Sequence, residues 1–251
     1  MKAIILAAGK GNRLGPIRGN NPKCLLEING LSLIERQVRL LRAVDINDIT
    51  AVVGFGANSV RARCGSELSY IENPRHGETN TLYSLWLTRH LWSTGFIVLN
   101  ADVLFHSQIL IDLISAPYED ALLVSYDNVK GMGYEEMKVK VHKGLIVDIS
   151  KELDPAEADG ENVGIVKFGA SGAKQLSHHI EGLLTEENLQ AWTSPAFREF
   201  ATFRNLHAIS TRGYPWIEID FPQDYANAVS RIWPAIVATD KLSTNLETVH
   251  T

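Results

Sequence analysis

The sequence predicts an α/β fold in which a mostly parallel sheet is flanked by helices and an antiparallel hairpin is inserted in the second half. Two observations support this prediction. Up to residue 126, short apolar runs alternate with segments of helical periodicity, which is typical of a parallel sheet covered by helices. Beyond that point, two strand-like segments are separated only by Lys143-Gly144, and such a short turn favours antiparallel pairing.

Four short, continuous apolar runs in the first half are interpreted as buried strands. They cover residues 2–7, 49–54, 96–100 and 121–126. The first helix among them is identified by apolar residues spaced three or four apart, namely Ile34, Val38 and Leu41. The predicted helices cover residues 32–43, 79–92 and 107–115, with Ser32 and Thr79 as candidate N-caps.

The predicted hairpin of the second half comprises residues 137–142 and 145–149. The remaining elements are strands over 162–168, 206–210 and 216–219, and helices over 170–183, 186–201 and 222–236. No linker rich in Pro, Gly or Ser interrupts the chain. We therefore predict a single domain over residues 1–238, followed by a loose polar tail over residues 239–251.

Composition excludes several classes of protein. With 45% hydrophobic and 21% charged residues, the chain is an ordinary globular protein, and its net charge of −5 argues against nucleic-acid binding. No apolar stretch has membrane-span length, and the apolar start is too short for a signal peptide. The two cysteines, Cys24 and Cys64, exclude a disulfide scaffold. We expect a cytoplasmic protein without a membrane partner; a homodimer is compatible with the sequence but not required by it.

A glycine-containing loop, LAAGKGNRLG, directly follows the first predicted strand. Ligands of open α/β sheets bind at the carboxyl ends of strands. Gly9 and Gly11 allow backbone N–H groups to approach a phosphate, while Arg13 and Lys23 supply positive charge. The dinucleotide fingerprint fails because Leu14 stands where a third glycine is needed, and no Gly-Lys-Ser/Thr closes a Walker loop. An ordinary glycine turn with a solvated arginine is the alternative.

The strings LAAGKGNRL (6–14) and PKCLLEING (22–30) together resemble the signature of nucleotidyltransferases with the Rossmann-like, GT-A-like fold. In that family the loop wraps the base and the triphosphate. The resemblance implies that Arg13 and Lys23 hold phosphates during catalysis. It also implies a nucleotide-binding loop formed by Leu6, Ala7, Ala8, Gly9 and Gly11.

Two aspartates lie at the ends of predicted strands, Asp102 after 96–100 and Asp220 after 216–219. Carboxylates of this kind can converge on Mg²⁺, which prefers one or two of them together with phosphate oxygens. Helix capping is the alternative for both, and Asp220 has capping-box spacing to Gln223. The family resemblance implies that both aspartates hold Mg²⁺, so Mg²⁺ is the expected cofactor.

Three segments indicate the base and the acceptor. ENPRHGETNTLYSLW (72–86) and EIDFPQDY (218–225) resemble the phosphocholine cytidylyltransferase branch, and residues 135–168 resemble a subset with phosphonate and sugar enzymes. Asn80 offers the donor and acceptor that a pyrimidine requires, unless it only bonds its own backbone. Glu161 is a candidate acceptor contact, and Trp216 is a candidate aromatic face for a choline-type cation. A solvated hairpin and a core tryptophan are the alternatives.

The sequence therefore predicts an Mg²⁺-dependent cytidylyltransferase. It would transfer CMP from CTP to a small alcohol phosphate or phosphonate, of the phosphocholine or 2-aminoethylphosphonate type, and release pyrophosphate. A sugar-1-phosphate nucleotidyltransferase and a catalytically silent nucleotide-binding subunit are the alternatives. The expected catalytic residues are Arg13, Lys23, Asp102 and Asp220.

Overall fold

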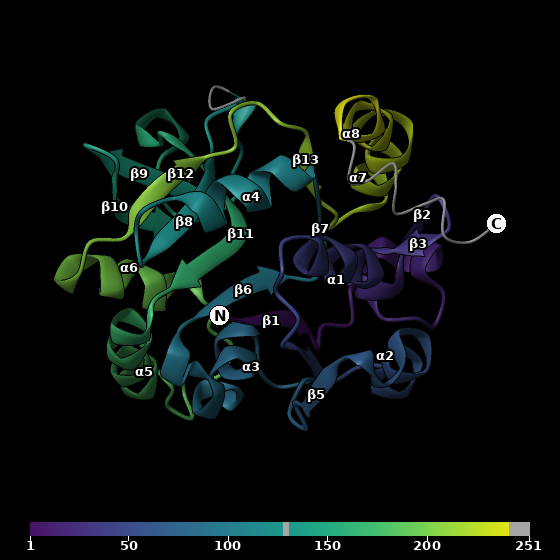
Figure 1. Ribbon diagram of the computed structural model, residues 1–251, viewed down its shortest axis with the longest axis horizontal. Helices are drawn as coiled ribbons and strands as arrows, with labels where there is room; N and C mark the ends of the chain where they lie inside the picture. The colour runs from purple at the N-terminus through teal and green to yellow at the C-terminus, as the bar shows by residue number, and fades with distance from the viewer. Residues whose placement is uncertain (128–130, 241–251) are drawn as a thin grey trace.

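A computed structural model describes residues 1–127 and 131–240. Its centre is a nine-stranded sheet with the order β5-β4-β1-β6-β11-β8-β12-β10-β9 (Figure 1). The first four strands in this order pair in parallel, as predicted for the first half of the chain. They are β5 (Ser69–Glu72), β4 (Ile49–Val53), β1 (Lys2–Ala7) and β6 (Phe96–Asn100).

The other half of the sheet is mixed. β11 runs antiparallel to both of its neighbours in the sheet order, β6 and β8, whereas β12 runs parallel to β8. The predicted hairpin is present as the antiparallel pair β9–β10 at the edge of the same sheet. The bounds are β8 (Ala121–Ser125), β9 (Lys138–His142), β10 (Leu145–Ser150), β11 (Gly160–Phe168) and β12 (His207–Ser210).

Helices cover both faces of the sheet because successive strand residues point to opposite sides. On β1, Ala3 and Ile5 join the hydrophobic core under α1, α2 and α4, whereas Ile4 and Leu6 join the core under α3, α5 and α6. The bounds are α1 (Leu33–Ala43), α2 (Ala57–Cys64), α3 (Thr81–Leu87), α4 (Ser107–Ser115), α5 (Ala170–Leu183) and α6 (Ser194–Phe203). Short 3₁₀ helices cover Asn12–Arg18, Lys23–Leu25, Gly65–Glu67, Arg89–Thr94 and Pro155–Glu157.

A third hydrophobic cluster joins the beginning of the chain to its end. Leu14 and Ile28 from the N-terminal part pack with Ile219, Trp233 and Ile236 from the C-terminal part. Figure 1 shows the yellow helices α7 and α8 beside the purple strands β2 and β3. The elements are β2 (Glu27–Ile28), β3 (Leu31–Ser32), α7 (Pro222–Asn227), a π-helical turn (Ala228–Ile232) and α8 (Trp233–Thr239). This packing places the segment that begins at Ile219 next to the N-terminal loop.

Several predicted boundaries were wrong for physical reasons. The helix predicted over 79–92 is α3 plus a 3₁₀ helix, and its cap is Asn80 rather than Thr79. The helix predicted over 186–201 begins only at Ser194, because the preceding segment bonds to the start of α3 instead: Asn80 N–H donates to the Leu189 carbonyl. β5 and α2 were not predicted, since neither carries a clear apolar pattern.

The last predicted strand and the predicted tail also need correction. β13 (Trp216–Glu218) lies outside the main sheet and pairs with β7 (Val103–Phe105). The tail was predicted to begin at residue 239, but Asp240 is buried and accepts hydrogen bonds from the Ser107 backbone N–H and hydroxyl, both at 2.7 Å. Residues 241–251 of that predicted tail lie outside the described residues.

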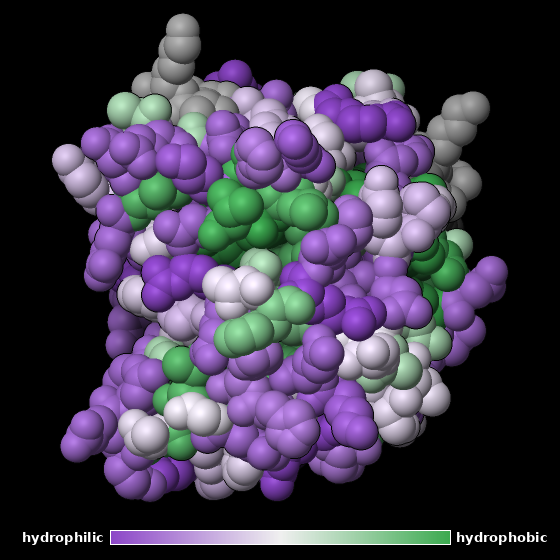
Figure 2. Space-filling model, turned by 90° about the vertical axis from the view of Figure 1, so that its left-hand side faces the viewer, coloured by the Kyte–Doolittle hydropathy of each residue, from purple (hydrophilic) through white to green (hydrophobic). Residues whose placement is uncertain are grey.

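The side of the molecule that carries α5, α6 and β10 is mainly hydrophilic, with hydrophobic side chains gathered near its middle (Figure 2). None of the helices among the described residues has the length and apolar character that crossing a membrane requires.

Phe168 should be among the side chains on which the fold depends most. It is fully buried, and the rings of Phe197 and Phe200 lie 5.4 and 5.1 Å from its own. We expect Phe168→Ala to lower the free energy of unfolding by about 3–5 kcal/mol in a urea titration. Phe203→Ala is the control, because that side chain is 70% exposed, and it should cost about 0.5 kcal/mol. Equal losses for the two variants would contradict this assignment.

Candidate active site

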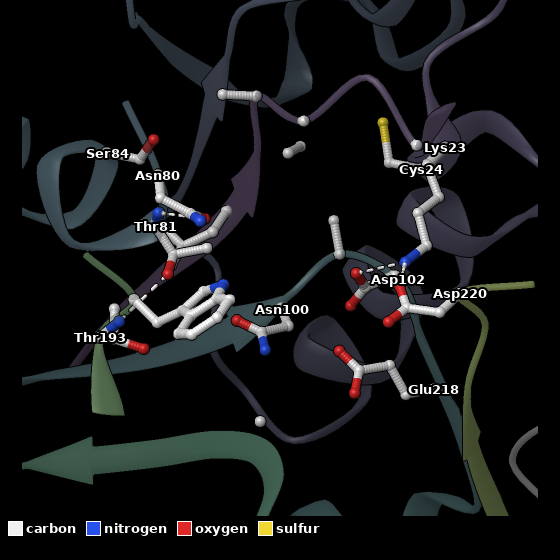
Figure 3. Close-up of a pocket in the computed structure, with 18 of the residues that line it drawn as sticks. Lys23, Cys24, Asn80, Thr81, Ser84, Asn100, Asp102, Thr193, Glu218 and Asp220 are labelled. Carbon is white, nitrogen blue, oxygen red and sulfur yellow. Dashed lines mark hydrogen bonds and ion pairs between the residues drawn. The ribbon is translucent and has the colours of Figure 1, made fainter. Parts of the chain in front are cut away.

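A pocket of about 510 Å³ opens at the carboxyl ends of β1 and β6. This is the edge where the sequence predicted a ligand. One end of the pocket is charged and the other carries hydroxyl and amide groups, as Figure 3 shows. Leu6, Ala7, Ala8, Gly9, Gly11, Arg13, Lys23, Asn80, Asp102 and Asp220 are the predicted site residues that line it.

The charged end is organised by the ammonium group of Lys23. Its Nζ lies 2.8 Å from Asp102 Oδ2 and also donates a hydrogen bond to Asp220 (Figure 3). Burial alone would lower the pKa of Lys23, but the two aspartates hold it above its usual range. For Asp220 the effects are opposite. Burial alone would raise its pKa, but Lys23 and Arg13 hold the pKa below its usual range. Lys23 and Asp220 are therefore charged at neutral pH.

Arg13 reaches the same end of the pocket from the N-terminal loop. Its Nη1 lies 3.4 Å from Asp220 Oδ2 and 3.5 Å from Glu135 Oε2, and the guanidinium sits 5.2 Å from the centre of the Phe221 ring. The side chain is half exposed, so it can exchange these carboxylate partners for the oxygens of a phosphate.

Glu218 is a third carboxylate at this end, and the sequence analysis did not assign it a role. Oxygen atoms of Asp102, Glu218 and Asp220 lie within 4.8 Å of one another. Burial, together with Asp102 and Asp220, raises the pKa of Glu218 to about 8. The sequence did contain a signal, because Glu218 and Asp220 are two residues apart and can therefore face the same side of an extended segment.

The carboxylate cluster has the donor chemistry of a site for a hard cation. Asp102 Oδ1 is buried and has no hydrogen-bond partner among the described residues. A buried carboxylate oxygen without a partner is costly unless a cation or a water satisfies it. The residues present therefore fit a divalent cation such as Mg²⁺, held by Asp102 and Asp220 with Glu218 beside them.

Neither aspartate has the capping role that was the alternative. α4 is capped by His106, whose ring nitrogen accepts from the Gln108 N–H at 3.0 Å. The carboxylate that caps α7 belongs to Asp224, which accepts from the backbone N–H groups of Asp220 and Phe221 at 2.9 and 2.7 Å. The capping-box interpretation through Gln223 was wrong, and the side chain of Asp220 remains directed at Lys23.

The N-terminal loop brings backbone close to the charged end. Gly11 has a φ of 69°, which favours glycine, and a Cβ at this position would lie 2.7 Å from the Lys23 side chain. A larger residue would therefore push Lys23 away from the two aspartates. Cys24 is buried and also lines the pocket (Figure 3).

The far end of the pocket is formed where α3 begins. Asn80 caps this helix, because its Oδ1 accepts from the Thr81 N–H at 2.8 Å. Asn80 therefore bonds its own backbone, as the alternative interpretation expects, and it also lines the pocket. Its contact with a base stays a prediction. Thr81 Oγ1 in turn accepts from the Thr193 N–H at 3.1 Å. Thr193 is the last residue of the segment that was wrongly predicted as helix.

The structure does not place the two predicted acceptor residues in the lining of the pocket. On β11, Asn162 and Gly164 face the pocket, whereas Glu161 does not line it. Trp216 pairs with Phe105 through β13 and packs against the core. Neither residue is a direct pocket contact, although Glu161 is close enough to Glu218 to help raise its pKa. Contact of Glu161 or Trp216 with the acceptor stays a prediction.

An aromatic face is nevertheless present in the pocket. It belongs to Trp192, and the ammonium group of Lys151 lies 5.1 Å from the centre of its ring. Sequence reasoning missed Trp192 because it assigned residues 186–201 to a regular helix.

Comparisons with known proteins identify the family to which the chain belongs. Residues 3–195 match the model of the MobA-like NTP transferase domain. The chain belongs to this family. It is 35% identical to the choline-phosphate cytidylyltransferase of Streptococcus pneumoniae over 121 residues, 47% of this chain and 52% of that protein. It is 25% identical to the CTP:phosphoglutamine cytidylyltransferase of Campylobacter jejuni over 248 residues, 89% of this chain and 97% of that protein.

A third relative and two solved structures complete the comparison for this NTP transferase. It is 32% identical to the CMP-5'-(3-aminopropyl)phosphonate synthase of Streptomyces rubellomurinus over 130 residues, 50% of this chain but only 21% of that protein. The inositol-1-phosphate CTP transferase of T. maritima superposes with a TM-score of 0.79 at 22% identity, covering 95% of this chain and 97% of the other. The CTP:phosphocholine cytidylyltransferase structure from Streptococcus pneumoniae gives 0.71 at 22%, covering 90% and 96%. These structures confirm the predicted fold class.

Glu161 provides a test of the electrostatics behind the pocket. Burial and the nearby Glu136 raise its pKa from 4.5 to about 7. The folded protein then keeps a proton that the unfolded chain releases near pH 4.5, so this group reduces stability as pH rises from 4.5 to 7. We expect Glu161→Gln to be more stable than the unsubstituted protein at pH 8, by at most roughly 3 kcal/mol. The difference should disappear below pH 4.5.

Urea titrations at pH 4 and pH 8 would measure this difference. Glu181→Gln is the matched control, because Glu181 is exposed and lies on the outer part of α5. A gain for Glu161→Gln that is the same at both pH values would contradict the assignment.

Proposed function

We propose that this NTP transferase is a cytidylyltransferase that passes CMP from CTP to a small alcohol phosphate or phosphonate and releases pyrophosphate. The observation that carries the proposal is the division of one pocket into two ends. Cationic side chains and three carboxylates gather at one end, and amide and hydroxyl groups gather at the other. A nucleoside triphosphate has the same division into a charged and a hydrogen-bonding part.

The relatives support the choice of CTP and the class of acceptor. The names of three relatives state that they act on choline phosphate, on phosphoglutamine with CTP, or form a CMP-linked aminopropylphosphonate. Each of these acceptors is a phosphate or phosphonate on a small nitrogen-containing group. We propose the same class for this chain, and we place the reaction in the cytoplasm.

The transfer forms one bond and breaks one. An oxygen of the acceptor phosphate or phosphonate attacks the α-phosphorus of CTP, and the bond from that phosphorus to pyrophosphate breaks. The attacking oxygen is already anionic, so no general base is needed. Catalysis then depends on positioning and on neutralising negative charge.

The chain's own residues supply most of that neutralisation. Lys23 is buried between its two aspartates and can exchange them for phosphate oxygens. Arg13, half exposed at the mouth, binds the departing pyrophosphate. Mg²⁺, when bound by Asp102 and Asp220, would polarise the phosphate oxygens and bring nucleotide and acceptor together.

Trp192 and Lys151 are the candidate contacts for the acceptor within the pocket. Trp192 offers an aromatic face, and a choline-type cation would bind such a face. Here Lys151 already lies over that ring, and its ammonium group would repel a second cation. An acceptor whose substituent is negatively charged or neutral, such as an amide, therefore fits beside Trp192 and Lys151 better than phosphocholine.

Pyrophosphate release in the presence of Mg²⁺ tests the proposal. The panel combines CTP, UTP, GTP and dTTP with phosphocholine, 2-aminoethylphosphonate and hexose 1-phosphates. We expect release with CTP and an alcohol phosphate or phosphonate. Release only with a hexose 1-phosphate would assign the chain to the sugar nucleotidyltransferases. Binding of CTP without release for any acceptor would favour a nucleotide-binding subunit.

Asp102→Asn tests the role of the carboxylates. The substitution keeps the shape of the side chain but removes the charge that faces Lys23 and the cation. We expect turnover to fall by about 10²- to 10³-fold, and Mn²⁺ binding measured by electron paramagnetic resonance to weaken in parallel. Asp45→Asn, at an exposed turn position that asparagine also adopts, is the control. Unchanged Mn²⁺ affinity in Asp102→Asn would remove Asp102 from the metal site.

A further inference from the structure

The far end of the pocket contains a buried amide, Asn73, which follows β5. It is 1% exposed and lines the pocket. Its Oδ1 accepts from the backbone N–H of Arg75 at 2.9 Å. Because only the oxygen of the amide can accept this bond, the orientation of the side chain is fixed. The Nδ2 group must then point the other way, toward α3.

Both hydrogens of that Nδ2 group are used. It donates to Thr79 Oγ1 at 2.9 Å and to Ser84 Oγ at 3.0 Å. The Thr79 hydroxyl in turn donates a hydrogen bond to the Arg75 carbonyl, also at 2.9 Å. Thr79 is therefore satisfied as both donor and acceptor, and its hydroxyl has no hydrogen left for a ligand.

Ser84 differs from Thr79 in this respect. Its oxygen accepts from Asn73, and its hydroxyl hydrogen has no acceptor among the described residues. Ser84 is 4% exposed and lines the pocket beside Asn80 (Figure 3). A buried hydroxyl hydrogen without an acceptor is unfavourable, so a bound ligand should accept from it. Asn80 adds a second donor, because its oxygen is occupied by the Thr81 N–H and its NH₂ group is not.

We propose that Asn73 is a positioning residue for base selection. By donating to the Ser84 oxygen, it makes the Ser84 hydroxyl a hydrogen-bond donor toward the nucleobase. Cytosine presents two adjacent acceptors, N3 and O2, whereas uracil carries a hydrogen on N3. Two neighbouring donors therefore pair with cytosine and leave an N–H facing an N–H or O–H when uracil is bound. This inference rests on the proposed function and adds the residues that distinguish CTP from UTP.

The direction of the hydrogen bonds can be reversed with little change of shape. In Asn73→Asp, one carboxylate oxygen still accepts from the Arg75 N–H, but the other now accepts from the Ser84 hydroxyl. Ser84 then turns its lone pairs toward the base, which suits the N3–H of uracil and opposes N3 of cytosine. A site whose polar groups are matched to one base rejects the other because its buried groups are left unpaired.

Binding constants for CTP and for UTP, measured by calorimetry with Mg²⁺ and without any acceptor, test the inference. The unsubstituted protein should prefer CTP. Asn73→Asp should lower the ratio of CTP to UTP affinity by roughly ten- to hundredfold, and Ser84→Ala should bring it toward one. Ser84→Thr, which keeps the hydroxyl, should retain part of the preference. Asn58→Asp, at an exposed position of α2, should leave the ratio unchanged.

The outcomes separate this inference from the proposed function. A wild-type CTP preference that survives in both Asn73→Asp and Ser84→Ala would overturn the inference, even if pyrophosphate release with CTP is normal. Loss of release with every acceptor would count against the proposed function, while the binding ratios would still decide the role of Asn73. If Asn73→Asp loses its thermal transition and does not fold, the Ser84 pair of variants decides alone.

Discussion

The ion pairs of Lys23 with Asp102 and Asp220 hold the site together. They join residues from the beginning, the middle and the end of the chain. A buried charge is costly when it lacks a partner, and here the Lys23 ammonium group is paired with both aspartates. Two features of the surrounding structure position these three residues. β6 ends immediately before Ala101-Asp102, and the third hydrophobic cluster holds the last helices against the N-terminal loop.

The opposite end of the pocket is built on hydrogen bonds rather than on ions. Asn73 links the end of β5 to α3, and the segment before α6 bonds back to the same helix. This end is therefore fixed by groups whose donors and acceptors are almost all used. A ligand at this end therefore meets only a few free hydrogen-bonding groups, each with a fixed direction. The charged side chains at the other end bind strongly but impose little direction.

The sequence predicted the parts of the site that are local in the chain. The glycine loop with Arg13 and Lys23 follows a recognisable strand, and Asp102 directly follows another, so neighbouring residues were enough to place them. Glu161 was assigned to the pocket because its segment resembled an acceptor-binding one. Its neighbour Asn162 lines the pocket and Glu161 does not, because successive residues of a strand point to opposite faces. Trp192 and Asn73 escaped prediction because their roles come from contacts between distant segments.

The short ribbon of β7 and β13 sets the geometry of the carboxylates. Glu218 pairs with Val103, and the Ile219 N–H donates to the Asp102 carbonyl at 3.1 Å. The spacing between the carboxylates from these two segments is therefore a property of strand registration. A slip of one residue would move Asp220 by about 3.3 Å and turn its side chain to the other face. An insertion or deletion in β13 would thus separate the carboxylates of Asp102 and Asp220 without replacing either residue.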